Sequence, residues 1–467
     1  MKFPFWPDPK NYCNINLGLT RVYDLLARLD NPHQKLPPTI HIAGTNGKGS
    51  TLSFLRAIFF EAGHLVHSYT SPHLVFFNER IVLAGAEISD EFLNECLQTC
   101  KEAASQHPEI EVTFFEGITV AAFLAFSKVK ADILLLETGM GGRLDATNVI
   151  EQNLLSIITP IDFDHTDFLG KTLAKIAFEK AGIIKKNCPV IVAKQKISAL
   201  QTIERQGLVM NSEMKIFGKD FAARKNHDRK TWDYEIILNN SNSLENFNCK
   251  TIANKIISKK DENILAKNYI QFPLPSLEGQ HQIDNAAVAI TAALTQKKLP
   301  INIEQIKLAL QKTFWPSRLQ KITSGKFAKI LSNNFELILD GSHNLQGATT
   351  VQKFLKSQKN KKRFVIFSML QDKDCKSFLN KIKNEVDELV CLTIPDESKS
   401  RDKNEIIKIA QNLKIKSCIA NNFEEAFAKI ITSCRADNSN SSCAKPLILV
   451  CGSLYLAGEF LKENNYS

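Results

Sequence analysis

The sequence predicts an α/β protein with a central, mostly parallel sheet in its N-terminal domain and a smaller, Rossmann-like α/β domain at the C-terminus. The chain has 467 residues, which is too many for one hydrophobic core. An apolar stretch at 39–43 leads into a glycine-rich turn and then a helical pattern, the arrangement of a phosphate-binding loop. Strand and helix patterns alternate again from about residue 320. We therefore expect one domain over residues 1–315 and a second over 320–467.

Composition is that of an ordinary globular protein, with 44% hydrophobic and 23% charged residues. No apolar run reaches the roughly 18 residues of a membrane span, and the N-terminus lacks the apolar core of a signal peptide, so we expect a cytoplasmic protein. The net charge of +10 comes from dispersed lysines without a basic helix interleaved with aromatics. We expect small anionic substrates, no nucleic acid and no membrane partner, and a monomer.

The eleven cysteines form no CxxC pair, so we expect reduced, mostly buried thiols and no zinc site.

The glycine-rich turn has an unusual spacing. In the common phosphate loop, four residues separate the glycines and Ser or Thr follows the lysine directly. Here only two residues separate the first two glycines, and a third glycine stands between the lysine and the serine. A bare glycine turn is often only structural, but the preceding strand, the lysine and the hydroxyls favour nucleotide binding. The predicted ATP-binding residues of the loop are Gly44, Thr45, Asn46, Gly47, Lys48, Gly49 and Ser50.

Two further stretches place chemically useful side chains after buried strands. Residues 132–137 are apolar on both faces, as in a central parallel strand, and end in Glu137. A carboxylate there suits a Mg²⁺-associated acid, although it could also simply face solvent. His165 follows the next strand pattern, at 154–159. A lone histidine at a strand end is more often structural, but its neighbourhood with Glu137 favours a functional role.

Five strings give the sequence a specific resemblance. They are G-T-N-G-K-G-S at 44–50, S-P-H-L at 71–74, G-G-R-L-D-A-T-N at 141–148, D-H-T-D-F-L-G at 164–170 and E-K-A-G-I at 179–183. Together they resemble the folylpolyglutamate synthase and dihydrofolate synthase family of Mur-type, ATP-dependent amide ligases. The resemblance covers most of the chain in order and is weakest over 195–270, where we expect antiparallel strands and variable loops without chemistry.

The resemblance implies a site for two Mg²⁺ ions, with ligands contributed by several of these strings. The implied ligands are Ser50, Ser71, Glu137, His165 and Lys180. In Mur-type ligases the lysine of E-K-A-G-I is carbamylated by CO₂, so the resemblance implies a carbamate on Lys180. Carbamylation needs the neutral amine, and we therefore expect a pKa that is lowered by burial or by nearby cations.

The resemblance also implies a folate pocket beside the metal site. Its implied residues are Leu17, Gly18, Phe114, Phe115, Glu116, Leu144, Asp145 and Ala146. Aromatic rings suit a flat heterocycle, and the carboxylate of Glu116 could accept hydrogen bonds from its amino groups. The same aromatics, which we place ahead of an apolar helix over 121–126, could equally belong to the core alone.

The C-terminal half contributes the remaining implied residues. Asn285, on a predicted helix, would contact ATP, although by itself it could be a surface amide. Arg318 follows Ser317, where the family has glycine, and would reach an ATP phosphate. In D-G-S-H-N, Asp340 would face ATP and His343 the incoming glutamate. Strands over 337–340, 364–367, 388–393 and 447–451 predict a small parallel sheet.

The function expected from this resemblance is ATP-dependent addition of L-glutamate to reduced folates, and to 7,8-dihydropteroate, through an acyl phosphate. Lys180, His165, Glu137 and His343 would be catalytic. One alternative is a cell-wall Mur ligase, but only about 40 residues precede the loop and K-G-S replaces the K-T-T of those enzymes. The other alternative is a P-loop switch or motor ATPase that performs no ligation.

Overall fold

The structure is a computed structural model, and it describes residues 4–8, 17–226, 230–237, 269–332, 334–395, 397–436 and 444–465. The chain separates into two compact units. The N-terminal unit comprises Met1–Ser276 and Gln280–Phe314, and the C-terminal unit comprises Leu277–Gly279 and Trp315–Ser467.

The main sheet of the N-terminal unit has eight strands within the described ranges, in the order β4-β3-β2-β5-β1-β6-β7-β8. The strands are β1 Thr39–Ala43, β2 Val66–Tyr69, β3 Ile81–Leu83, β4 Ala86–Glu87, β5 Ile133–Glu137, β6 Leu155–Ile158, β7 Val190–Val192 and β8 Met214–Ile216. All pair in parallel from β2 to β8, and only β3 and β4 are antiparallel. Every residue of β1 and β5 is buried, as central parallel strands require.

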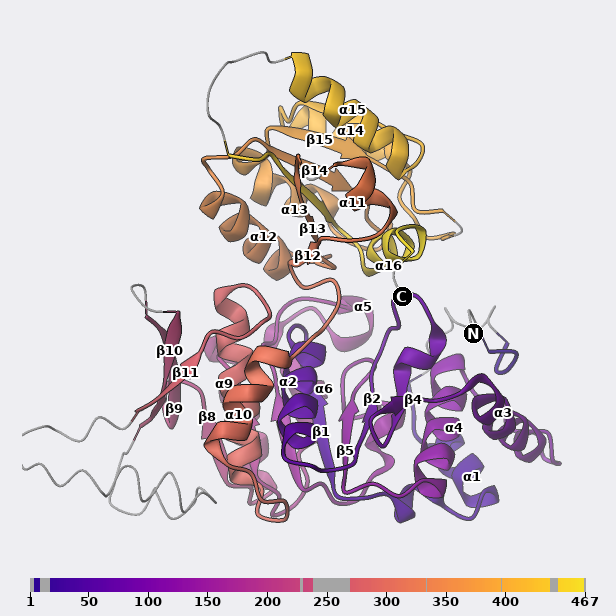
Figure 1. The fold of residues 1–467 in the computed structure, drawn as a ribbon. Helices are drawn as coiled ribbons and strands as arrows, with labels where there is room; N and C mark the ends of the chain where they lie inside the picture. Colours follow the sequence, from indigo (N-terminus) through magenta and orange to yellow (C-terminus); the bar gives the residue numbers. More distant parts are fainter. Residues whose placement is uncertain are drawn as a thin grey trace, which may run out of the picture. The chain divides into compact units, whose positions relative to one another are not determined.

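Helices surround this sheet, and in Figure 1 α2, α9 and α10 form one group while α1, α3 and α4 form another. The helices are α1 Thr20–Arg28, α2 Lys48–Glu61, α3 Asp90–Ala104, α4 Phe114–Lys128, α5 Thr166–Leu169, α6 Leu173–Ala181, α7 Ile197–Val209, α9 Gln280–Thr295 and α10 Ile303–Lys312, with short 3₁₀ turns η2 Pro32–Lys35, η3 Phe77–Arg80 and η4 Ala146–Val149. The mostly parallel α/β fold that we predicted is therefore confirmed.

Two local predictions were wrong. The aromatics do not precede a helix but begin one, because Thr113 caps α4 and starts it at Phe114. The stretch from 195 contains a helix, α7, whose buried positions Ala199, Ile203 and Gly207 recur every four residues. The antiparallel strands expected there form a separate sheet of β9 Phe221–Lys225, β10 Thr231–Ile236 and β11 Tyr269–Pro273. The loops predicted at 239–243 and around 437–443 lie outside the described residues.

The C-terminal unit is a second α/β layer structure. Its described part contains a six-stranded sheet in the order β12-β13-β17-β14-β15-β16, parallel except for β12. The elements are β12 Gln320–Ile322, α11 Lys326–Ile330, β13 Glu336–Leu339, α12 Leu345–Ser357, β14 Arg363–Phe367, α13 Cys375–Ile382, η5 Lys383–Glu385, β15 Glu388–Cys391, α14 Lys403–Asn412, β16 Ser417–Ile419, α15 Phe423–Ala436, β17 Leu447–Cys451 and α16 Leu454–Glu463. The four predicted strands are confirmed, while β12 and β16 were not predicted.

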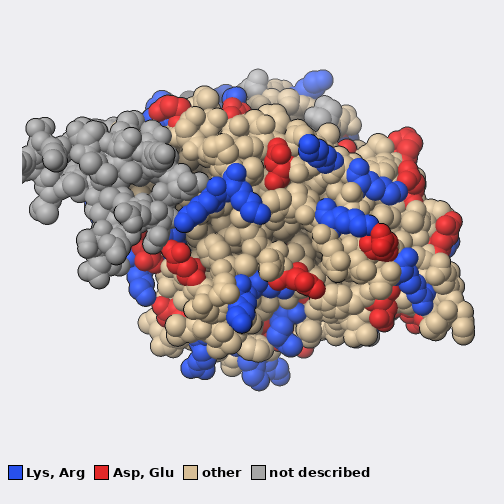
Figure 2. Space-filling model, turned by 90° about the horizontal axis from the view of Figure 1, so that it is seen from below, with Lys and Arg blue, Asp and Glu red and all other residues tan. Residues whose placement is uncertain are grey.

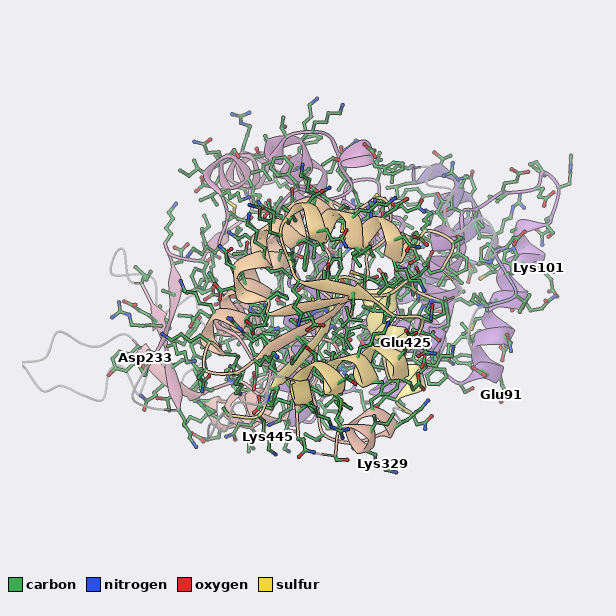
Figure 3. The ribbon with its side chains drawn as sticks, turned by 90° about the horizontal axis from the view of Figure 1, so that it is seen from above. Glu91, Lys101, Asp233, Lys329, Glu425 and Lys445 are labelled. Atoms are coloured by element: carbon green, nitrogen blue, oxygen red, sulfur yellow. The ribbon has the colours of Figure 1, made fainter. Side chains whose placement is uncertain are left out.

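The surface carries dispersed charge. On the face drawn in Figure 2, basic side chains are scattered with acidic ones between them. Figure 3 shows Glu91 and Lys101 projecting outwards from α3. The acid lies in the first turn of this helix and the base in its last, as the helix dipole favours. No helix in the described part of the chain is long and apolar enough to cross a membrane.

Candidate active site

Four adjacent parallel strands bring the predicted metal and phosphate residues to one edge of the N-terminal sheet. The strands lie in the order β2-β5-β1-β6 and all point the same way. Ser71 follows β2, Glu137 ends β5, the glycine loop follows β1 and His165 follows β6. Ligands bind at the carboxyl ends of the strands in open α/β sheets, so this edge is the candidate site.

The glycine loop needs its glycines for two different reasons. Gly47 has a φ of +84°, which side chains rarely adopt, and a Cβ there would lie 2.7 Å from Asn285 Oδ1. At Gly44 a Cβ would lie 1.8 Å from the hydroxyl of the buried Thr159. Asn285 of α9 is therefore packed directly against the loop, in the place where the resemblance puts an ATP contact.

The loop is fastened to the strand beside it. The backbone N–H groups of Thr45 and Asn46 both donate to the carbonyl of Pro160, at 3.0 and 3.2 Å. The Thr45 hydroxyl donates to the carbonyl of Asp162 at 3.0 Å. These groups thus hold the loop in place. The N–H groups of Lys48, Gly49 and Ser50, at the start of α2, have no acceptor within the helix and are suited to bind an anion.

Glu137 and Lys48 form the charged pair of this edge. Lys48 Nζ lies 3.7 Å from Glu137 Oε1, and the glutamate is only 4% exposed. Ser50, two residues further along α2, is also buried. A carboxylate and a hydroxyl are oxygen donors of the kind that Mg²⁺ prefers, so the chemistry of these side chains fits the implied metal.

Lys180 of α6 contacts the first residue of the glycine loop. Its Nζ donates to the carbonyl of Gly44 at 2.9 Å, and the side chain is buried. Burial, followed by the nearby charge of Lys48, lowers the pKa of Lys180 to about 7. A substantial fraction of its amine is therefore neutral near pH 7, as carbamylation requires.

Two glycines allow α6 to come so close. A Cβ on Gly142 would lie 2.8 Å from the carbonyl oxygen of Glu179. A Cβ on Gly182 would lie 2.3 Å from Arg143 Cβ. The G-G-R and E-K-A-G strings therefore pack against each other, and Arg143 Nη2 also pairs with the Glu179 carboxylate at 3.0 Å.

His165 and Ser71 lie on more exposed loops of the same edge. His165 has a left-handed backbone with a φ of +48°, and 38% of its side chain is exposed. The loop after Ser71 is ordered by Glu79, whose carboxylate accepts from the N–H groups of residues 74–76 at 2.6–2.8 Å. Within the described residues, no cluster of three or more His, Cys, Asp or Glu is arranged to hold a metal. The implied ligand set differs from such a cluster because it includes serines and a modified lysine.

Some of the predicted folate residues are buried or bonded to other protein groups, and others are partly exposed. Phe114 belongs to the core and is 2% exposed, whereas Phe115 is partly exposed and lies against Gly139 of the loop after β5. Glu116 accepts from Thr113 N at 2.7 Å and from Arg21 Nη2 at 2.7 Å. This carboxylate thus caps α4, as a capping box with Thr113, and ties the helix to α1 through Arg21, neither of which was predicted.

The other predicted folate residues lie in two loops. Leu17 and Gly18 are half-buried and lie just before α1, and Leu144 is half-buried in the loop after β5. Asp145 and Ala146 are each 4% exposed. Asp145 accepts from Met140 N at 2.7 Å and from Thr147 N at 3.0 Å, so it fixes the shape of its own loop.

In the C-terminal unit, the predicted residues gather at the end of β13. Asp340 accepts from Leu319 N and from Ser342 N, each at 2.9 Å. His343 Nδ1 lies 2.9 Å from the carbonyl of Gly341, and Arg318 Nη1 donates to the carbonyl of Ser317 at 2.9 Å. A Cβ on Gly341 would lie 2.9 Å from Arg318 Nη1, so the arginine packs onto the same loop.

Sequence reasoning missed two buried polar residues near the predicted ones. Gln282 is fully buried and accepts from Asn285 Nδ2 at 3.0 Å, which fixes the orientation of that amide. Its spacing of three residues from Asn285 on a predicted helix could have revealed this contact. His41 in β1 bonds to Thr147, and its position within an apolar strand was the available signal.

Both parts of the chain match known protein families. Residues 42–293 match the family model of the Mur ligase middle domain, and residues 323–463 match the C-terminal domain of dihydrofolate synthetase. The dihydrofolate synthase/folylpolyglutamate synthase of Bacillus subtilis is 35% identical over 380 residues, 79% of each chain. The probable dihydrofolate synthetase of Schizosaccharomyces pombe is 30% identical over 460 residues, 96% of this chain and 98% of that one.

Solved structures agree with the sequence relatives. Escherichia coli FolC in complex with DHPP and ADP has a TM-score of 0.77 at 26% identity, and covers 96% of this chain and 93% of its own. A bifunctional folylpolyglutamate synthase/dihydrofolate synthase with Mn, AMPPNP and L-glutamate bound has a TM-score of 0.76 at 25% identity, with coverages of 96% and 94%. With both halves of the chain matched in this way, the protein belongs to the folylpolyglutamate synthase/dihydrofolate synthase family of Mur-type ligases.

Proposed function

We propose that this protein joins L-glutamate to a pteroate carboxyl group, that of 7,8-dihydropteroate or of a reduced folate, using ATP. The observation that carries the proposal is the buried Lys180 amine, which lies 2.9 Å from the carbonyl of Gly44 in the phosphate loop. A lysine that only bound phosphate would be expected to remain charged, whereas this one has a pKa of about 7. An amine in that state can take up CO₂ and become an anionic ligand, and such a ligand would support a Mur-type ligase over a switch ATPase.

The reaction has two steps. An oxygen of the pteroate carboxylate attacks the γ-phosphorus of ATP, and the bond between that phosphorus and the β–γ bridging oxygen breaks. ADP departs, and the pteroate is left as an acyl phosphate. The neutral amine of glutamate then attacks the acyl carbon, an amide forms, and phosphate leaves. The protein contributes positioning and charge neutralisation to both steps. Lys48 and the first-turn N–H groups of α2 would hold the outer phosphates of ATP.

The residues that would hold two Mg²⁺ ions are Ser50, Ser71, Glu137, His165 and carbamylated Lys180. When bound, the metal ions would neutralise charge on the transferring phosphoryl group. Buried oxygen donors on Ser50 and Glu137, with a lysine already close to neutral, support this assignment. Intact mass or a density map recorded in bicarbonate buffer tests the carbamate. Unmodified Lys180 under conditions where activity persists would contradict it.

The C-terminal unit would contribute the remaining contacts. Arg318 and Asp340 would face ATP, and His343 the incoming glutamate. Their gathering around one strand end, through Gly341 and the backbone of Ser317, supports a shared role. Asn285 would contact ATP within the N-terminal unit, because it lies against Gly47. Phe115 and Asp145 would line the pteridine side.

The deciding experiment is ADP release by the purified protein with each substrate omitted in turn. We expect turnover only when ATP, L-glutamate and a pteroate are all present. Release of ADP that is unaffected by omitting glutamate or the pteroate would exclude the ligase and leave a simple ATPase. Parallel assays with 7,8-dihydropteroate and tetrahydrofolate as acceptors identify the preferred one, and mass spectrometry of the products gives the number of glutamates added.

We further propose that the protein works as a monomer in the cytoplasm. The cysteines in the described ranges form no disulfide bonds, which fits a reducing compartment. Even Cys96 and Cys100, which are both buried and lie one helical turn apart, are free thiols. Sedimentation equilibrium tests the monomer, because a concentration-dependent mass would contradict it.

A further inference from the structure

A buried histidine links the phosphate strand to the loop after β5. His41 lies in the middle of β1 and is fully buried. Its Nε2 lies 2.8 Å from Thr147 Oγ1, and that hydroxyl donates to Asp145 Oδ1 at 2.5 Å. None of the reaction steps above uses His41 or Thr147, although Asp145 belongs to the proposed pteridine pocket.

The direction of this chain of hydrogen bonds follows from its ends. Nδ1 of His41 is buried and has no hydrogen-bond partner in the structure described, so the ring proton is best placed on Nε2. Nε2–H then donates to Thr147 Oγ1, and the hydroxyl proton of Thr147 points to Asp145. The ring stays neutral, because burial and the nearby Lys185 lower the pKa of His41 to about 3.

The far end of the chain is a carboxylate with a fixed orientation. Asp145 Oδ1 accepts from both the N–H and the hydroxyl of Thr147, and Oδ2 accepts from Met140 N. Donors on both oxygens favour the ionised form and oppose the penalty of burial, which raises the pKa of Asp145. The Thr147 oxygen accepts the His41 N–H while its own proton goes to Asp145, so the histidine helps to keep the hydroxyl proton turned towards the carboxylate.

We propose that His41 is a positioning residue for the pteroate acceptor, acting through Thr147 and Asp145 to hold the shape of the loop of Leu144, Asp145 and Ala146 that would line the pteridine. The inference rests on the proposed function, since it requires that a pteridine binds beside Asp145. It predicts that His41 influences the acceptor selectively, although it lies in the strand that leads to the ATP loop.

The test compares His41→Leu, which removes the donor, with His41→Gln, whose amide N–H can replace Nε2–H. We expect His41→Leu to raise the KM for dihydropteroate about five- to tenfold, the effect of one lost buried hydrogen bond. The KM for ATP and kcat should change by less than about twofold, and His41→Gln should recover most of the loss. Thr147→Val should raise the KM for dihydropteroate to the same extent, and Thr147→Ser should not. The double variant His41→Leu/Thr147→Val should have a KM no higher than that of either single variant, because both changes break the same chain of hydrogen bonds.

His67→Leu is the matched control. His67 is also fully buried, in strand β2 of the same sheet, and bonds only to backbone in the described hydrogen bonds, to Val129 O and from Ala84 N at 2.9 Å each. This variant should lose thermal stability while keeping the wild-type KM for dihydropteroate.

The outcomes separate the two proposals. If the wild type turns over dihydropteroate but His41→Leu keeps its KM, His41 is merely structural and only this inference falls. Equal rises in the KM for dihydropteroate and for ATP would have the same meaning. If the wild type shows no acceptor-dependent ADP release, the proposed function fails and this inference fails with it. Should His41→Leu not fold, the contrast between Thr147→Val and Thr147→Ser decides the matter.

Discussion

Glu137 and Asp340 occupy comparable places, because each stands at the carboxyl end of a buried parallel strand, one in each unit. Both carboxylates are almost fully buried, at 4% and 3% exposure. Their surroundings differ. Asp340 accepts from the backbone N–H groups of Leu319 and Ser342 and from the Ser342 hydroxyl. Glu137 instead lies 3.7 Å from the ammonium of Lys48.

This difference separates two uses of a strand-end acid. A carboxylate saturated by backbone N–H groups holds a loop in shape, and its removal leaves buried donors unsatisfied. A carboxylate that faces a lysine at the start of a helix would, on the proposed function, exchange that cation for a bound metal. We therefore expect changes at the N-terminal edge to affect turnover first, and changes at the C-terminal edge to affect stability first.

The largest effect should come from Lys180→Met. Loss of the amine removes both its contact to Gly44 and any carbamate, so kcat should fall on the order of 10³-fold in the ADP-release assay. Lys175→Met, at an exposed position of the same helix, is the matched control and should keep wild-type turnover. Substantial activity in Lys180→Met would remove the main support for a Mur-type mechanism.

The paired variants Glu137→Gln and Asp340→Asn test the comparison directly. Glu137→Gln should lower kcat about 10²-fold with little change in the unfolding midpoint, because an uncharged amide is a poor partner for a metal. Asp340→Asn should lower the free energy of unfolding of its unit by about 2 kcal/mol. The reason is that the new amide NH₂ would replace an oxygen that accepts hydrogen bonds, and would face those donors without an acceptor. Urea unfolding and steady-state kinetics measure both. The reverse assignment, with Glu137→Gln unstable and Asp340→Asn fully folded but inactive, would refute the distinction drawn here.

The pH dependence of stability gives a third test. The pKa of Lys180 is about 7 in the folded protein and about 10.5 when unfolded, so between these values the unfolded chain binds more protons. Wild-type stability should therefore rise relative to Lys180→Met as the pH increases from 7 towards 10. The gain should be about 2 kcal/mol by about pH 9 in CO₂-free buffer, measured by urea unfolding. A difference that is constant with pH would mean that the lysine is not buried as a largely neutral amine.

The edge of the N-terminal sheet could be foreseen from the sequence because it depends on local patterns. Apolar runs fix β1, β5 and β6 as buried strands, and parallel pairing then brings their carboxyl ends together. The same reasoning predicts from the sequence that the loop, Glu137 and His165 lie at one edge of the sheet. The start of α4 was missed although Thr113 and Glu116 form a capping box, because the aromatics between them suggested a ligand pocket instead.

Long-range partners could not be foreseen in the same way. The bond between Arg21 and Glu116 joins residues 95 positions apart, and that between His41 and Thr147 spans 106. No periodicity encodes such pairs, since they depend on which strands become neighbours. The resemblance implied a lowered pKa for Lys180, with burial or nearby cations as its cause, but that Lys48 is the nearby cation depends on the fold.

The smallest expected effect concerns the residue where the family has glycine. Ser317 has a φ of +57°, in the left-handed region that disfavours side chains, and its buried hydroxyl has no hydrogen-bond partner in the described structure. Ser317→Gly should remove the backbone strain and the unsatisfied hydroxyl. The free energy of unfolding should rise by about 1 kcal/mol, a gain that the greater freedom of glycine in the unfolded chain partly offsets. Leu319→Gly serves as the control, because Leu319 also has a left-handed backbone but loses a buried side chain, so it should be destabilising. Thermal unfolding distinguishes the two. Arg318 Nη1 donates to the carbonyl of Ser317. If Ser317→Gly stabilises the loop but weakens ATP binding, the serine holds the arginine in position at the expense of stability.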